Sequence, residues 1–201
     1  MAITINGDGT LTGISVGGLP DGIVDTDMLA TDAVTAAKIG SLPAGSILQV
    51  KQTVKTDTDT TTSQESYGDV TGMSVSITPS SDSNKILIQI ALGRVGASTA
   101  NRTTMFRILR GTTAIAIGDT DGVRSVGTFA TSDYSTTYSP GGAGFTFLDS
   151  PSTTSATTYK LQWSGQAGET HRLNGSGSNA DNVDAPHTRC VSTITVVEVA
   201  G

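Results

Sequence analysis

The sequence predicts an all-β protein: an antiparallel β-sandwich or jelly roll of eight to nine strands, preceded by a short N-terminal arm. Thr and Ser make up a little over a quarter of the 201 residues and Gly contributes 24, a composition that favours strands and turns. Aromatic residues are 4% and charged residues 15%, so the expected core is aliphatic and modest. From residue 46 onward, alternating apolar and polar runs follow one another with turn signals between them, which is the spacing of a sandwich.

The predicted strands are segments in which every second residue faces the same side. They span residues 47–55, 70–78, 85–95, 104–118, 123–131, 143–148, 157–164 and 189–199. In two of these strands the apolar residues fall on one side and are expected to face the core. They are Ile86, Ile88, Ile90 and Leu92 in 85–95, and Tyr159, Leu161 and Trp163 in 157–164.

The last predicted strand carries apolar residues on both faces. Ile194 and Val196 alternate with Val197 and Val199. Because one side of this strand faces the core, the other side needs a partner, and association would supply burial at about 25 cal/mol per Å² of apolar surface. This pattern favours an oligomer.

The first quarter of the chain differs from the rest, and we expect two parts: a docking arm with a short repeat segment at 1–45 and a sandwich head domain at 46–201. Residues 1–45 contain five Asp and one Lys, so they carry −4 of the net charge of −6. Two short alternating runs flank a Gly-rich turn at 6–9 and predict a hairpin. Apolar residues then recur every five positions over 24–39, a pattern that fits a short helix, an acidic linker, or copies winding around an axis.

Charge and targeting signals exclude several functions. The net charge is −6 and no cluster of Lys or Arg is present, so no nucleic-acid partner is expected. The one cysteine, Cys190, allows no intrachain disulfide, which fits assembly in a bacterial cytoplasm. The N-terminus lacks a signal-peptide pattern, and the apolar run at 86–92 is too short for membrane insertion.

The residues that could act in catalysis do not form a pattern typical of an enzyme. His171 and His187 are the two histidines; Cys190 follows His187 by three positions, but no G-x-S-x-G motif is present. Acidic pairs lie in polar turns and are interpreted as solvated rather than Ca²⁺-binding, so no metal and no cofactor are expected. These pairs are Asp57 with Asp59, Asp119 with Asp121, and Asp181 with Asp184.

Three stretches near the C-terminus resemble the final domain of tail-fibre and related virion proteins of bacteriophages, notably those of marine and cyanobacterial hosts. They are 158–163 (TYKLQW), 172–176 (RLNGS) and 192–199 (STITVVEV). The segment 27–39 is similar to the short repeats that precede such domains. The resemblance implies a virion protein that forms a homotrimer and docks on the particle through its N-terminal segment, with no catalytic residues.

Two sets of contact residues are predicted on this basis. The hairpin residues Ile3, Ile5, Leu11 and Ile14 are expected to dock on other virion proteins of the tail, baseplate or capsid. Binding residues usually lie on loops, so we expect a host surface glycan or protein to contact two loops of the head domain. The predicted contact residues there are Tyr134, Tyr138, Asn174, Ser176 and Asn179.

The sequence is compatible with three functions. The favoured one is a trimeric tail fibre or appendage subunit that contacts the host surface. The alternative is a capsid-decorating protein, a cement or head-fibre protein on the phage head, because the chain has almost no shaft. A polysaccharide depolymerase is supported only by carboxylates on the surface. The two catalytic carboxylates of a glycosidase are defined by their distance in the fold, so the sequence nominates no such pair.

Overall fold

The computed structural model describes residues 4–5, 11–12, 42–64, 66–132, 141–184 and 187–201. The chain divides into two units, Met1–Leu42 and Pro43–Gly201. In the first unit, β1 (Thr4–Ile5) pairs antiparallel with β2 (Leu11–Thr12), and Ile5 lies opposite Leu11. The predicted hairpin is therefore present. The five-residue pattern at 24–39 lies outside the described residues.

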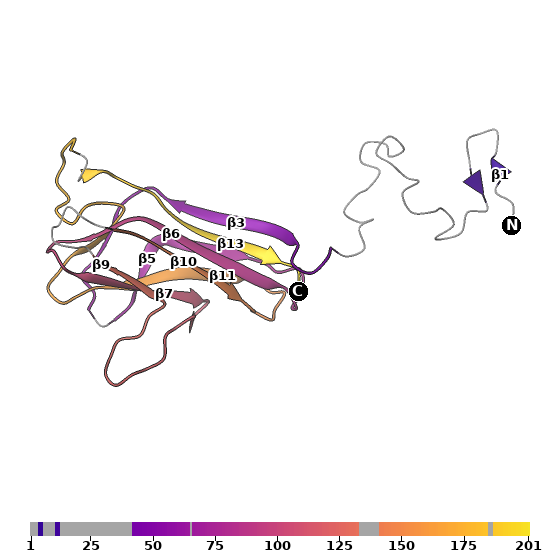
Figure 1. The fold of residues 1–201 in the computed structure, drawn as a ribbon, viewed down its shortest axis with the longest axis horizontal. Helices are drawn as coiled ribbons and strands as arrows, with labels where there is room; N and C mark the ends of the chain where they lie inside the picture. Colours follow the sequence, from indigo (N-terminus) through magenta and orange to yellow (C-terminus); the bar gives the residue numbers. More distant parts are fainter. Residues whose placement is uncertain (1–3, 6–10, 13–41, 65, 133–140, 185–186) are drawn as a thin grey trace. The chain divides into compact units, whose positions relative to one another are not determined.

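The second unit, called the sandwich below, consists of two antiparallel sheets, so the predicted fold class is confirmed (Figure 1). The first sheet has six strands, in the order β3-β13-β6-β12-β4, with β10 paired to β6 as well. Ile90 of β6 pairs with both Ile194 and Phe145, which places β13 and β10 on opposite sides of β6. The strands are β3 (Ile47–Lys55), β4 (Asp59–Thr61), β6 (Lys85–Ala97), β10 (Gly141–Asp149), β12 (His171–Leu173) and β13 (Ser192–Val199).

The second sheet has five strands in the order β5-β11-β7-β8, with β9 also paired to β7. Its strands are β5 (Gly68–Ile77), β7 (Thr103–Arg110), β8 (Thr113–Ile115), β9 (Phe129–Ser132) and β11 (Thr157–Ser164). Within the described ranges, no helix has the length and apolarity that a membrane crossing requires.

One hydrophobic core lies between the sheets. Ile88 and Ile90 from β6 and Ile194 and Val196 from β13 are 0–3% exposed. Trp163 from the facing sheet is 1% exposed. Large aromatic side chains are few, but they are concentrated at this centre, where rings stack at centroid distances of 5.0–6.4 Å. The stacked residues are Phe106, Phe129, Phe145 and Trp163.

A buried carboxylate joins the two sheets at one end. Asp149 of β10 accepts hydrogen bonds from Arg110 Nη1 of β7 at 2.9 and 3.0 Å and from the Tyr159 hydroxyl of β11 at 2.6 Å. Burial and the hydrogen bond to this carboxylate both raise the pKa of Tyr159. Arg110 and Tyr159 thus compensate the charge of Asp149 at the edge of the core, as burial of a carboxylate requires.

A second buried carboxylate anchors the end of β13. Glu198 is 1% exposed and accepts hydrogen bonds from Ser80 N and Oγ, Asn84 Nδ2 and Gln49 Nε2. Burial raises the pKa of Glu198, but these hydrogen bonds together outweigh burial, and the pKa is lowered overall. The anchoring side chains come from β3 and from the turn between β5 and β6, so they hold both sheets against the last strand.

Some strand predictions were wrong. The run 104–118 is a hairpin of β7 and β8, because Gly111 adopts φ +59° and turns the chain. The run 123–131 is a strand only from Phe129, and the run 189–199 only from Ser192. The short strands β4 and β12 were not predicted, so the two sheets hold eleven strands among the described residues rather than eight or nine.

Candidate functional site

The first candidate site is the face of the six-stranded sheet that points away from the core. Val197, Thr195 and Thr193 lie on this face of β13, opposite to Ile194 and Val196. Residues paired directly across strands share a face, so the register defines three rows across four strands. The rows are Val50–Val197–Leu87–Leu148, Gln52–Thr195–Gln89–Thr146 and Val54–Thr193–Ala91–Gly144.

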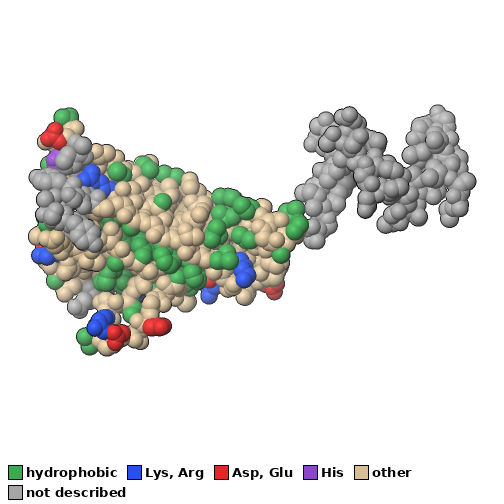
Figure 2. Space-filling model, in the orientation of Figure 1, with side chains coloured by type: hydrophobic (Ala, Val, Ile, Leu, Met, Phe, Trp, Pro, Cys, Tyr) green, Lys and Arg blue, Asp and Glu red, His purple; other side chains and the backbone are tan. Residues whose placement is uncertain are grey.

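These twelve residues, called the outer face below, include no charged side chain. Val50, Val54 and Leu148 are 56, 50 and 47% exposed. Figure 2 shows hydrophobic side chains gathered over the region of β3, β13 and β6 with few charged side chains among them. The side of an antiparallel sheet that faces water normally carries polar and charged residues. The twelve residues of the outer face therefore have the composition of a contact surface.

The second candidate site is the loop that follows β12. Its first residue, Asn174, has φ +61° and is fully buried. Its side-chain amide donates to the carbonyls of Lys55 and Asp57 at 2.9 and 3.0 Å, and its oxygen accepts from Ser192 Oγ at 2.6 Å. Asn174 therefore ties the loop to β3 and β13, and asparagine suits the left-handed backbone that this turn needs.

Two of the predicted receptor-contact residues are buried in the sandwich. Asn174 is 0% and Ser176 2% exposed, so neither side chain is accessible to a receptor in the folded sandwich. Asn179 lies on the exposed part of the loop, and its role in receptor contact stays a prediction. Tyr134 and Tyr138 lie outside the described residues.

The predicted docking residues belong to the first unit. Ile5 and Leu11 are cross-strand partners in the hairpin of β1 and β2, while Ile3 and Ile14 lie outside the described residues. Their role in docking on other virion proteins stays a prediction.

The chain also has an open, mostly polar hollow of about 450 Å³ beside β7 and the end of β11. It is lined by Gln64, Arg102, Met105, Gly165, Gln166 and Ala167. Arg102 pairs with Glu169 at 3.2 Å, and hydrogen bonds from Ser98 and Thr99, together with Arg102, lower the pKa of Glu169 to about 2. The hollow therefore contains an ion pair fixed by neighbouring side chains rather than a cluster of reactive groups.

Both histidines have neutral groups within hydrogen-bonding distance. His171 is fully buried; its Nε2 accepts the N–H of Gln166 at 2.9 Å, so Nδ1 carries the proton and donates to Thr104 Oγ1 at 2.7 Å. Nδ1 of His187 lies 3.5 Å from the hydroxyls of Ser176 and Ser178. His171 thus serves the packing of β12 against β7. Among the described residues, no group of three or more His, Cys, Asp or Glu is placed to hold a metal ion.

No family model and no curated protein matches the chain. Among solved structures, the VP2 subviral particle of infectious bursal disease virus is similar with a TM-score of 0.38 and 15% identity, over 76% of this chain and 37% of that one. The structure of the Gx strain of the same virus is similar with a TM-score of 0.36 and 15% identity, over 77% of this chain and 43% of that one. The chain spans less than half the length of either protein.

The structural role of Asn174 can be tested against Asn179, which also has a positive φ. Glycine tolerates that backbone, so Asn174→Gly and Asn179→Gly remove only the side chains. Asn174→Gly removes the hydrogen bonds to the Lys55 and Asp57 carbonyls and to the Ser192 hydroxyl, and should lower the free energy of unfolding by about 2–4 kcal/mol. Asn179→Gly should change it by less than about 1 kcal/mol. Urea denaturation measures both; equal effects would show that burial of Asn174 is not what anchors the loop.

Proposed function

We propose that the chain is a structural subunit of a bacteriophage virion, a homotrimeric tail fibre or appendage protein that contacts the host surface and has no enzymatic activity. The observation that carries the self-association is the uncharged outer face of the six-stranded sheet. The phage assignment is supported by the resemblance of three C-terminal stretches to tail-fibre domains. Two of these stretches are the strands β11 and β13, which contribute Trp163 and Ile194 to the core.

The outer face favours a second copy of the chain as its partner. Within the aliphatic row, Val197 is 6% exposed, while Val50 and Leu148 at the two ends of the row are 56 and 47% exposed. A face that is aliphatic in one row and uncharged in the next two can lose water without leaving an unpaired charge. Apolar contact of this kind distinguishes interfaces of permanent oligomers from ordinary surface.

Closed symmetry supports a trimer rather than a filament. Copies that meet through a fixed surface either close into a ring or continue into a fibre, and soluble homo-oligomers close. A ring of three sandwiches would carry three copies of the arm. The acidic arm at 1–45 would then dock on other virion proteins, and the loops of the sandwich would meet the host surface.

The oligomer can be tested by size exclusion with light scattering. The wild type should have a mass of about 61 kDa, three times the chain mass of 20.4 kDa. Val50→Lys with Leu148→Lys places two charges on the outer face at exposed positions, so the fold should persist while the mass falls towards that of a single chain. Val123→Lys is the control, because Val123 is fully exposed in a loop away from that face. A wild-type monomer at micromolar concentration contradicts the trimer.

The virion location can be tested by immunogold labelling of particles of the phage that encodes the chain. Label on the tail supports the fibre or appendage; label on the head supports the capsid-decorating alternative instead. A chain that lacks residues 1–45 should remain folded, because the core lies wholly in the sandwich, but should no longer join particles. Incorporation of the truncated chain would assign docking to the sandwich, and unlabelled particles would contradict a virion protein altogether.

A further inference from the structure

Two arginines meet at the loop end of the sandwich. Arg172 lies on β12, and Arg189 lies in the segment that leads to β13. Both pass over Gly175: a Cβ atom on this glycine would lie 2.7 Å from Arg189 Nη1 and 3.2 Å from Arg172 Cδ. The glycine therefore leaves the space in which the two side chains come together, although their charges repel each other.

Neither arginine has an anionic partner in the part of the chain that the structure describes. Among the described residues, no carboxylate oxygen lies within 4.0 Å of Arg172 or Arg189. Arg172 Nε is buried and makes no hydrogen bond with a described residue. Arg189 Nη2 donates to the neutral side-chain oxygen of Asn179 at 3.0 Å. Burial and the charge of Arg189 both lower the pKa of Arg172, which shows that the surroundings do not compensate its charge.

The two carboxylates that flank Thr58 are held by other groups. Thr58 borders the same glycine, with Cγ2 3.4 Å from the Cβ position, and has an aspartate on each side in the chain. Asp57 is paired with Lys55 Nζ at 2.9 Å, and Asp59 accepts the backbone N–H groups of Thr60 and Thr71. The fold thus keeps both carboxylates away from the arginine pair.

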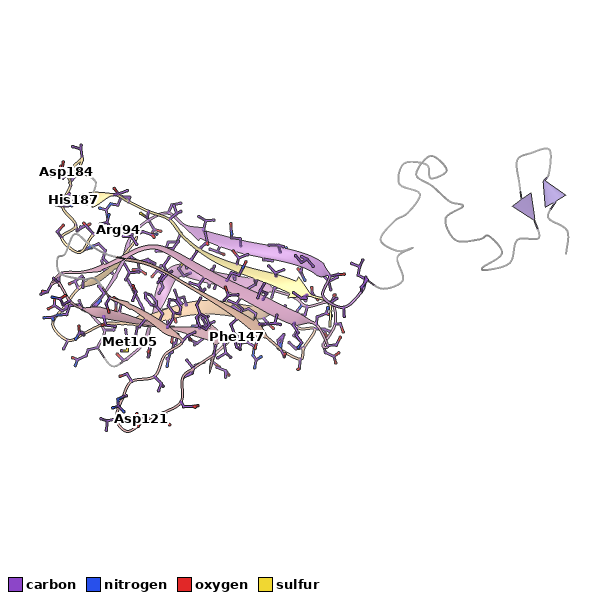
Figure 3. All side chains as sticks on the ribbon, in the orientation of Figure 1. Arg94, Met105, Asp121, Phe147, Asp184 and His187 are labelled. Carbon is purple, nitrogen blue, oxygen red and sulfur yellow. The ribbon has the colours of Figure 1, made fainter. Side chains whose placement is uncertain are left out.

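The loop end carries further positive and polar groups. Figure 3 shows Arg94 and His187 at this end of the sandwich, together with Asp184 on the tip of the loop. Arg94 is 9% exposed, and its carbonyl accepts the N–H of Asn174, so it is anchored beneath the loop. Asp184 is exposed and forms no ion pair with Arg172 or Arg189. The arginine pair therefore gives this part of the loop a local positive charge, although the chain as a whole is acidic.

We propose that Arg172 and Arg189 form a binding site for an oxyanion carried by an acidic polysaccharide of the host surface. A guanidinium presents parallel N–H donors that match the two oxygens of a carboxylate or phosphate group, and two guanidiniums side by side hold such a group far better than one. The side-chain amide of Asn179 borders the pair through its contact with Arg189 and suits sugar hydroxyls. Recognition through charge also fits a chain with few aromatic side chains for stacking on sugars.

The oxyanion site follows from the contacts of the two arginines, whereas the host surface as the source of the ligand rests on the proposed function. The site is tested on the purified full chain by isothermal titration calorimetry at low salt, with three probes. Oligogalacturonate carries carboxylates, a glycerol phosphate oligomer carries phosphates, and a dextran oligomer of similar length carries neither. We expect binding of at least one acidic probe and none of dextran, and the stronger acidic probe identifies the group that the site takes.

Variants separate the site from general electrostatic attraction. Arg189 is exposed, so Arg189→Gln should fold normally and weaken binding about tenfold to a hundredfold, the effect of removing one charge-assisted contact. Arg172→Lys keeps the charge but loses the paired donors and should weaken binding by at least about threefold. Arg124→Gln removes the same charge from an exposed arginine that pairs with Asp121 on another loop, and should change binding by less than about twofold.

If neither acidic probe binds, the proposed site is wrong. The site is also wrong if Arg189→Gln binds the acidic probe as tightly as the wild type and the Arg124→Gln control do. These results do not depend on where the protein is located. Binding together with unlabelled phage particles would retain the oxyanion site and remove the virion function, whereas labelled particles without binding would retain the virion function and remove the site.

Discussion

The alternation of side chains along β6 and β13 is the constraint on which the rest of the structure depends. Ile90 and Ile194 point into the only core of the sandwich within the described residues, and the next residues along each strand must then point outward. Shifting either strand by one residue would exchange the two faces, so the core register also decides which residues form the outer face. Leu87 and Val197 lie there because Ile88 and Val196 are needed inside. An aliphatic outer row is therefore not required for folding of the single chain, and its presence points to a second use.

Most of the fold could be predicted from the sequence because apolar and polar side chains alternate along the long strands. The apolar sets on β6 and β11 are buried as the alternation predicts. Strands of three residues, such as β4 and β12, show no period and are stabilised by neighbours distant in the chain. The predicted strand at 104–118 failed for a different reason: the apolar pattern continues through Gly111, but the backbone turns at that glycine.

The candidate sites were harder to predict, since they depend on which polar residues the fold buries. Asn174 stands in a loop of small polar residues, a composition that indicates exposure, yet its side chain satisfies three backbone or hydroxyl partners inside the sandwich. Likewise, Arg172 and Arg189 are far apart in sequence and meet only because β12 and the approach to β13 flank the same turn. The outer row from Val50 to Leu148 collects one residue from each of four segments, so no sequence window contains it.

The central claim is that copies of the chain meet across the outer face, and a spin label at its middle tests this most directly. In a Cys190→Ser background, a nitroxide on Gln89→Cys lies in the central row, and a nitroxide on Val123→Cys lies on an exposed loop. If copies cover the outer face, the label at position 89 has an immobilised spectrum broadened by dipolar coupling between copies, while the label at 123 stays mobile. Sharp, mobile spectra at both positions in the assembled protein would contradict the account.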